Sequence, residues 1–502
     1  MAEPTHLTET LQELIATRKE KLQDLRELGI NPYPYGFDVT HYAKEINTNF
    51  ARYAERVDVR LAGRIMAIRR MGKASFAHIQ DSTDRIQIYL KVDNIGEKMY
   101  EASKLLDIGD WVGVAGKVMK TRTDEITVFT EELTVLSKSI RPIPVVKEKE
   151  GEQYDAFSDK EQRYRQRYLD LIVNPEVKDV FIRRSDIIRT IRQYMDSRGF
   201  IEVETPVLQP IYGGATARPF VTHHHTLDTD LYLRIADELY LKRLIVGGFE
   251  KVYEIAKDFR NEGMDRNHNP EFTMLEWYQA FVDYNYEMDM VENLIATVAE
   301  EIVGSEVTYN GKTINLEPPY ARKSMFELLE EYLGTDVSDF DRDQLMALAE
   351  EKNLDTDEQW NYGKVLDKLF GEFVEPHLIQ PTFVTDHPIA ISPLAKKKRN
   401  DSDRLVERFE LIIAGMEVSN AFSELNDPID QRERLEAQTA MRDAGDKEAQ
   451  VIDEDFLAAI ETGMPPTGGV GIGIDRIVML LTDQQSIKDV ILFPQMRPQT
   501  SD

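Results

Sequence analysis

The first thirty residues place apolar side chains at helical spacing. Gly29 and Pro32 interrupt the pattern, as expected at the end of a helix. The apolar positions that recur on one face are Leu7, Leu11, Leu14, Leu22, Leu25 and Leu28. We therefore expect an N-terminal helical extension over residues 1–56.

Between residues 57 and 140 the spacing changes to that of short strands. Five runs rich in β-branched and aromatic residues are separated by turn signals, with one helical stretch, EKMYEASKLL, after the third run. Five strands and one helix predict an OB-fold β-barrel over residues 57–145. Residues 140–153 begin with prolines and continue with charges, which is typical of a linker.

The remainder of the chain alternates helices and strands without a regular βαβ rhythm. Two adjacent strand patterns over residues 409–425 have only a short connection, which favours antiparallel pairing. The prediction is an α+β domain over residues 146–502, with an antiparallel β-sheet flanked by helices. Residues 320–376 are acidic and helical in pattern, and we expect them to form an insertion.

Composition restricts the function more than the fold. The 502 residues carry 61 Lys and Arg against 90 Asp and Glu, a net charge of −29, which argues against non-specific nucleic-acid binding. A specific nucleic-acid partner stays possible, because local basic patches decide phosphate contact. Cysteine is absent, so disulfides and thiolate chemistry are excluded. No apolar run approaches the roughly 18 residues of a membrane span, and we expect a cytoplasmic protein without a membrane partner.

Residues 253–278 read as a strand, a polar loop and a returning strand. The first strand leads into Arg260 and Glu262, and the second carries Phe272 and Tyr278. Arginine can hold phosphate through two parallel hydrogen bonds, and an aromatic ring can stack on adenine. An ordinary hairpin with a surface salt bridge explains these residues equally well.

Residues 468–481 combine closely spaced glycines with the start of an apolar helix. Arg476 stands in the first turn of this helix, and a helix N-terminus with an arginine suits a phosphate group. The glycine spacing matches neither a Rossmann fingerprint nor a P-loop. Glycines that serve only tight strand–helix packing are the open alternative.

Residues 409–425 alternate with period two, which puts Asn420, Phe422 and Glu424 on one face of a strand. Glu410 and Glu417 stand in the same segment. Carboxylates in an apolar setting are costly unless they are paired or bind a metal, and their oxygen atoms suit Mg²⁺. A half-buried strand with its polar face in water is the alternative.

In order and spacing, these segments resemble the signature motifs of class II aminoacyl-tRNA synthetases. The helix and strand over residues 191–210, ending at Pro206, resemble the first motif, a dimer element. FRNEG (259–263) with His268 and Phe272 resembles the second, and GIGIDR (471–476) the third. The stretches GGATARPF, LYLRIADELYLKRL, AFSELNDP and ILFPQMRP resemble bacterial lysine-specific members. The resemblance covers nearly the whole chain and includes the OB-type domain.

The resemblance implies a ligase that activates L-lysine with ATP and Mg²⁺ to lysyl-adenylate. Lysine is then transferred to the 3′-terminal adenosine of tRNA(Lys), and the enzyme works as a homodimer. Arg260 and Arg476 would be catalytic. The implied ATP site comprises Arg260, Glu262, His268, Phe272, Glu410, Glu417 and Arg476, with Glu410 and Glu417 as the Mg²⁺ ligands.

The same resemblance implies two recognition sites. The implied lysine site comprises Gly214, Glu238, Arg260, Tyr278, Asn420, Phe422, Glu424 and Gly471. An ammonium group needs carboxylate and hydroxyl acceptors, which Glu238, Glu424 and Tyr278 supply. In the OB-type domain Phe76 would stack on an anticodon base, while Gln87 and Glu132 would read base edges. The alternative for Phe76 is a buried barrel residue.

Three other functions compete with this interpretation. A paralogue that lysylates an acceptor other than tRNA generally lacks the anticodon domain, which this chain is expected to have. An aspartate or asparagine enzyme is opposed by Glu238 and Glu424. A non-catalytic RNA-binding protein on the same fold would be expected to lose Arg260, Glu417 or Arg476.

Overall fold

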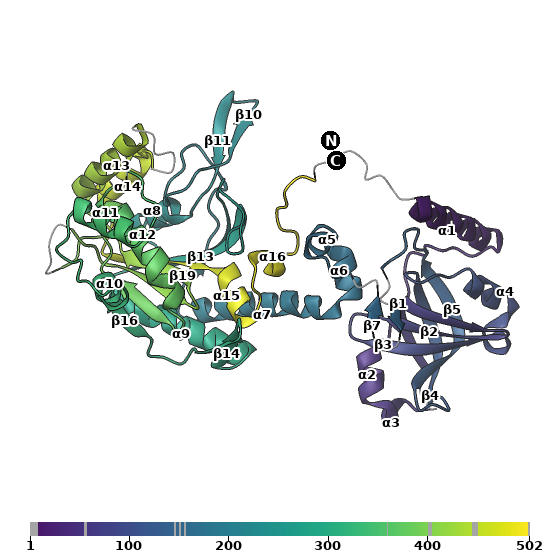
Figure 1. Cartoon of the computed structure of the whole chain (residues 1–502). Helices are drawn as coiled ribbons and strands as arrows, with labels where there is room; N and C mark the ends of the chain where they lie inside the picture. Colours follow the sequence, from purple (N-terminus) through teal and green to yellow (C-terminus); the bar gives the residue numbers. More distant parts are fainter. Residues whose placement is uncertain are drawn as a thin grey trace. The chain divides into compact units, whose positions relative to one another are not determined.

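Two structural units divide the chain at residue 159 (Figure 1). The structure is a computed structural model that describes residues 9–54, 58–144, 147–149, 152–154, 157–358, 360–399, 404–443 and 450–499. The predicted boundaries at 56/57 and 145/146 lie outside the described residues, as does Leu7 of the predicted first helix. Among the helices of these ranges, none is long and apolar enough to cross a membrane.

The first unit is a closed five-stranded barrel with the strand order β1-β2-β3-β5-β4. Its strands are β1 (Asp58–Met71), β2 (Ala74–Gln80), β3 (Arg85–Lys91), β4 (Trp111–Lys120) and β5 (Ile126–Ser137). Its helices are α1 (Glu9–Glu27), α2 (Ala43–Thr48), α3 (Phe50–Tyr53) and α4 (Val92–Lys104). Side chains at alternate strand positions fill the interior of the barrel. Ala77 and Ile79 of β2 point inward, as do Val112 and Val114 of β4. The predicted OB-type barrel is confirmed.

The predicted linker is not entirely irregular. It contains a small antiparallel hairpin of β6 (Lys147–Lys149) and β7 (Glu152–Tyr154). Neither three-residue run alternates apolar and polar positions, so periodicity could not reveal these strands.

The second unit is built on an eight-stranded sheet with the order β16-β17-β18-β19-β20-β13-β12-β8. The strands are β8 (Ile201–Glu202), β12 (Lys251–Phe259), β13 (Glu271–Ala280), β16 (Ala321–Ser324), β17 (Thr382–Thr385), β18 (Arg408–Ile413), β19 (Met416–Ser423) and β20 (Thr467–Gly473). All pairs are antiparallel except β16–β17 and β8–β12 at the two edges. The α+β prediction is confirmed, with parallel edges that the sequence pattern did not indicate.

Helices cover the sheet and bury its apolar side chains. One core cluster joins α7 (Pro175–Ser197), α9 (Tyr284–Ile302) and α15 (Ile474–Leu481) to the central strands through residues such as Ile191, Leu294 and Val478. A second cluster joins α8 (Glu238–Val246) and α14 (Glu454–Gly463) to β12 and β13. Packed helices therefore cover much of the sheet, while residues of β13, β18, β19 and β20 line a cavity on one face.

Smaller elements complete the second unit. They are α5 (Lys160–Arg165), α6 (Arg167–Val173), α13 (Pro428–Asp443), α16 (Ile487–Val490), the strands β9 (Leu208–Gln209), β10 (Val221–His224) and β11 (Thr229–Leu233), and the hairpin β14 (Glu306–Tyr309) with β15 (Lys312–Asn315). Three helices with their own apolar core follow β16: α10 (Met325–Leu333), α11 (Arg342–Glu351) and α12 (Tyr362–Phe373). They fall within the predicted insertion, whose residues 321–324 belong to the main sheet.

The strand expected to run from Gly199 to Pro206 is much shorter than the sequence suggests. Only Ile201 and Glu202 form β8, and Val203 donates one further backbone hydrogen bond to Tyr253. The Thr205 backbone N–H instead donates to the Glu254 carboxylate at 3.1 Å. The prediction of a full strand was wrong because a side chain replaces the neighbouring strand as acceptor.

Replacing Glu287 with glutamine should flatten part of the pH dependence of stability. Glu287 of α9 is buried and accepts a hydrogen bond from Trp277 Nε1 at 2.8 Å, and burial raises its pKa to about 8. The folded chain therefore holds a proton that the unfolded chain releases above its ordinary pKa. Unfolding free energy consequently falls as pH rises towards 8.

Glutamine keeps an acceptor for Trp277 and cannot ionise. We expect the Tm of Glu287→Gln, relative to the unmodified chain, to rise by about 2–5 °C between pH 5 and 8.5 in differential scanning fluorimetry. The exposed Glu301→Gln on the same helix is the control and should show no such trend. A difference in Tm that does not change with pH would contradict the assignment.

Candidate functional site

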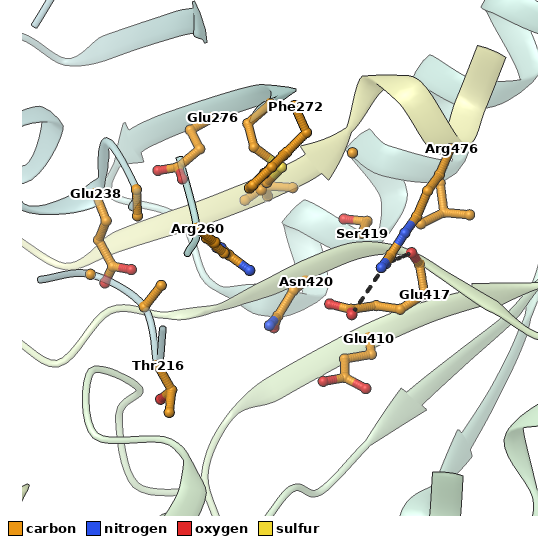
Figure 2. A pocket seen from close by; sticks show the side chains of 18 of the residues that line it. Thr216, Glu238, Arg260, Phe272, Glu276, Glu410, Glu417, Ser419, Asn420 and Arg476 are labelled. Atoms are coloured by element: carbon orange, nitrogen blue, oxygen red, sulfur yellow. Dashed lines mark hydrogen bonds and ion pairs between the residues drawn. The ribbon is translucent and has the colours of Figure 1, made fainter. Parts of the chain in front are cut away.

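One face of the sheet forms the floor of a cavity of about 410 Å³ (Figure 2). Four floor residues are direct cross-strand partners on adjacent strands: Glu410 pairs with Asn420, Asn420 with Gly471, and Gly471 with Glu276. A parallel row two residues further along contains Phe422, Gly469 and Tyr278. Because side chains two apart share a face of a strand, both rows point into the same cavity.

The structure brings together the sequence segments that were singled out separately. Every predicted ATP-site and lysine-site residue lines this cavity, with the exception of Glu424, which is buried next to the lining residue Gly469. Figure 2 shows Glu238 and Arg476 at opposite ends, with Arg260 and Asn420 between them. The site is thus elongated, with an acidic end and an end that carries both signs of charge.

Three elements converge at the Arg476 end. Arg476 Nη1 donates to the backbone oxygen of Glu417 and lies 3.4 Å from its Oε2 atom, and Nη2 lies 3.4 Å from His268 Nε2. The other ring nitrogen of His268 lies 2.8 Å from an Asp265 carboxylate oxygen. This end therefore offers an arginine and a histidine from different elements to one ligand group.

Two carboxylates beside Arg476 suit a hard cation. Glu410 and Glu417 lie on the neighbouring strands β18 and β19, and both line the cavity. Burial raises the pKa of Glu410 to about 8; Arg408, whose Nη2 lies 2.6 Å away, opposes the rise, and the charge of Glu417 adds to it. Carboxylate oxygens that repel one another suit Mg²⁺, because the cation would offset their negative charge.

Arg260 occupies the middle of the cavity. It follows β12 directly, and its backbone N–H donates to Pro270 across the hairpin loop. Its Nε donates to the Ile235 carbonyl at 3.3 Å, and its guanidinium carbon lies 5.1 Å from the centre of the Phe272 ring. Figure 2 shows the guanidinium pointing into the cavity, between its two ends.

The acidic end is formed by Glu238 and Tyr278, with the buried Glu424 beside Gly469. Tyr278 donates to Glu276 Oε2 at 3.2 Å. Gly469 makes this arrangement possible, since a Cβ there would lie 2.0 Å from Glu424 Oε1 and 2.4 Å from the Tyr278 ring. Gly214 closes the wall with a φ of +87°, and its missing side chain leaves room for Glu238.

Several cavity residues were not predicted. Arg408 lines the cavity and donates to Asn420 Oδ1 at 3.0 Å as well as pairing with Glu410. The alternation of β18 could have revealed it, because Arg408 stands two residues before Glu410. Glu276 also lines the floor, and it was assigned no role although it stands two residues before Tyr278.

A buried acidic cluster includes Glu276, and no sequence pattern indicated it. Carboxylate oxygens of Glu276, Asp237 and Asp258 lie within 4.8 Å of one another. Arg234 balances part of this charge, with ion pairs of 3.2 Å to Asp237 and 3.4 Å to Asp258. Burial raises the pKa of Glu276 to about 8 and that of Asp258 to about 6.

The barrel of the first unit carries a row of aromatic side chains on its outer surface. The Phe76 and Tyr89 ring centres lie 4.7 Å apart, and those of Tyr89 and Phe129 lie 5.2 Å apart, across β2, β3 and β5. Phe76 is half-buried on this outer face, so the alternative of a core residue is wrong.

The other two predicted anticodon residues differ from Phe76 in their surroundings. Gln87 is buried; it accepts from Thr127 at 2.7 Å and donates to Glu125 at 2.6 Å. Glu132 is exposed and pairs with Arg60 at 3.0 Å, beyond a register shift in β5. Gln87 would have to exchange these internal hydrogen bonds for contacts with a base.

Comparison with protein families identifies both units. Residues 159–497 match the family described as tRNA synthetases class II (D, K and N). Residues 59–136 match the OB-fold nucleic acid binding domain. The first match covers most of the unit with the cavity, and the second covers the barrel.

Individual relatives are similar over almost the whole chain. A lysine–tRNA ligase of Moorella thermoacetica is 55% identical over 497 residues, covering 98% of this chain and 99% of the relative. One from Carboxydothermus hydrogenoformans is 54% identical, covering 97% and 99%. One from Porphyromonas gingivalis is 51% identical, covering 97% of this chain and 86% of the relative.

Proposed function

The chain belongs to the lysine–tRNA ligase family of the class II tRNA synthetases, and from this membership we propose how its cavity joins lysine to ATP and then to tRNA(Lys). One observation carries the residue assignment. The cross-strand row from Glu276 to Glu410 connects an acidic end to an end that also carries Arg476 and Glu417. A cation-bearing amino acid and a metal-bound triphosphate fit these two ends.

The acidic end would receive lysine. The side-chain ammonium of the substrate lysine needs acceptors in a desolvated pocket, and Glu238, Glu424 and Tyr278 would supply them. Phe422 would pack against the methylene groups, while Gly214, Asn420 and Gly471 would shape the channel. The substrate carboxylate then points towards Arg260 in the middle of the cavity.

The opposite end would receive ATP. Phe272 would stack on adenine with Glu262 at its edge, Arg260 would hold the α-phosphate, and His268 and Arg476 the γ-phosphate. Glu410 and Glu417 would hold Mg²⁺, whose charge would offset that of the phosphates. Their carboxylates fit this ion by donor type, and they stand on two paired neighbouring strands.

The chemical step needs no protein nucleophile. A carboxylate oxygen of lysine attacks the α-phosphorus, and the bond to the leaving pyrophosphate breaks. Arg260 would hold both reacting groups in line and stabilise the charge that develops on the α-phosphoryl oxygens. The adenylate is then attacked by the ribose 3′-hydroxyl of the terminal adenosine of tRNA, and AMP leaves.

Lysine-dependent ATP–pyrophosphate exchange tests the first half of this proposal. Exchange should occur with lysine and not with aspartate or asparagine, and chelation of Mg²⁺ should abolish it. Aminoacylation of tRNA(Lys) then tests the second half and separates a tRNA acceptor from another acceptor. No exchange with any amino acid would contradict the proposal and favour a non-catalytic RNA-binding protein.

Phe76→Ala should weaken tRNA use without affecting amino-acid activation. The ring belongs to the half-buried aromatic row on the outer face of the barrel, and stacking of a base on such a ring contributes about 1–3 kcal/mol. We expect KM for tRNA(Lys) to rise about 10- to 100-fold while pyrophosphate exchange stays unchanged. Tyr35→Ala, a fully exposed aromatic of the same unit, is the control. Equal KM values for the two variants would contradict the role of Phe76.

We also propose that the chain forms a homodimer through α7. A depression beside this helix is lined by the apolar residues Leu171, Phe181, Ile182 and Leu492 and by the polar residues Lys178, Ser185, Asp186 and Arg189, and Ile182 is 48% exposed. Burying such a patch would be favourable.

Sedimentation equilibrium should give a dimer for the unmodified chain and a shift to monomer for Ile182→Glu. Arg183→Glu, adjacent on α7 but outside the depression, should stay dimeric. A monomeric unmodified chain at micromolar concentration would refute the proposal.

A further inference from the structure

A buried lysine of the protein itself contacts both carboxylates of the acidic end. Lys242 Nζ lies 2.5 Å from Glu238 Oε1 and forms a second ion pair with Glu424. The Lys242 side chain has no solvent exposure, and its Nζ lies 5.5 Å from the centre of the Phe422 ring. Among the described residues that line the cavity, Glu238 is included and Lys242 is not. Lys242 therefore reaches the carboxylates from behind the wall.

The chain produces this contact by combining a local and a distant pair. Glu238 and Lys242 stand four residues apart on α8, which places them on one helix face. Glu424 arrives at the end of β19, where its backbone N–H donates to the Thr467 carbonyl. The other carboxylate oxygen of Glu424, Oε1, has no hydrogen-bond partner among the described residues.

The charges of Glu238, Glu424 and Lys242 set the net charge of the pocket. Burial raises the pKa of Glu238 and of Glu424, and the Lys242 ammonium opposes that rise. With both carboxylates ionised, the three groups leave a net charge of −1 in a buried site. Arg408 also acts electrostatically on Glu238, but its guanidinium forms its ion pair with Glu410 at 2.6 Å, and Glu276 belongs to the neighbouring cluster with Asp237 and Asp258. One substrate ammonium would then neutralise the pocket. Without Lys242 the pocket would hold −2, and a single ammonium would leave a buried charge uncompensated.

We propose that Lys242 is an internal counter-ion that sets the lysine pocket to one negative charge, so that one substrate ammonium neutralises it. The inference rests on the proposed function. Lys242 is a positioning residue in this account, because it acts through Glu238 and Glu424 and does not touch the substrate. The affinity of the pocket for lysine should accordingly depend on the net charge of the pocket as well as on each individual side chain.

A double substitution tests this charge balance. Glu424→Gln alone leaves Glu238 and Lys242 with no net charge, and KM for lysine in pyrophosphate exchange should rise about 100-fold. Adding Lys242→Met restores a net charge of −1, and KM should recover at least tenfold relative to Glu424→Gln. A purely structural role for Lys242 would make the double variant as impaired as either single variant, or more so.

Two controls keep the outcome interpretable. Lys251→Met combined with Glu424→Gln removes a lysine that contacts neither carboxylate, so it should give no recovery. KM for ATP should be unchanged in every variant, which reports an intact fold. If the unmodified chain exchanges with lysine and the double variant shows no recovery, the counter-ion proposal is wrong and the function stands. If the unmodified chain does not exchange at all, the proposed function itself fails.

Discussion

Arg260→Lys should lower kcat/KM for lysine-dependent pyrophosphate exchange by about 10²- to 10³-fold, although the charge is retained. A lysine ammonium is a point charge, whereas a guanidinium can hold two oxygen atoms in a fixed plane. Arg260 is already oriented by the Ile235 carbonyl and the Phe272 ring, so its free nitrogen atoms have a defined direction. Arg260→Ala should lower the rate further, because the positive charge is then lost as well.

The same loop offers a matched control for Arg260. Arg266 is exposed, donates to the Gln485 carbonyl at 3.1 Å and is not one of the residues that line the cavity. Arg266→Lys should keep activity within about threefold of the unmodified chain, as is usual for a surface substitution. Arg260→Lys with more than a tenth of the original kcat/KM would contradict a bidentate role.

The second large effect concerns Mg²⁺. Glu417→Gln should raise the Mg²⁺ concentration for half-maximal exchange at least tenfold, and the double variant Glu410→Gln with Glu417→Gln should lose about 10³-fold in kcat/KM. Both carboxylates line the cavity from adjacent strands, and the charge of Glu417 helps to raise the pKa of Glu410. Removing one charge therefore weakens the attraction for a divalent cation, and removing both leaves few oxygen donors.

Metal binding can be measured apart from activity. Titration with Mn²⁺, followed by electron paramagnetic resonance in the presence of ATP, should show weaker binding for Glu417→Gln than for the unmodified chain. Glu372→Gln is the control, because Glu372 is exposed and lies outside the cavity lining. An unchanged Mg²⁺ requirement in the double variant would exclude these two residues as ligands.

The local sequence pattern was sufficient to predict the strands that carry the site. Period-two alternation placed Asn420 and Phe422 on one face, and both line the cavity. The hairpin between Arg260 and Phe272 has the predicted strands on both sides of its loop. The barrel followed from the count and spacing of its strands. These features depend on neighbours within a few residues, which a sequence displays directly.

The resemblance to class II synthetases decided between explanations that the residues alone left open. By themselves, the hairpin at Arg260 and the glycines before Arg476 had structural explanations as good as the functional ones. The order of several motifs along one chain removed that ambiguity, and the family matches over residues 59–136 and 159–497 agree with it.

Sequence by itself therefore predicted the barrel, the antiparallel sheet and thirteen of the residues that line the cavity. Only the tertiary structure decided which residues meet across strands, such as Glu410 with Asn420 and Gly471 with Glu276. It alone placed Lys242 between Glu238 and Glu424, and Asp237 beside Asp258. The physical reason is that periodicity fixes the direction of a side chain relative to its own element. The register between strands and the charge of a buried pocket depend on residues far apart in the chain, which meet only when the sheet and its helices pack.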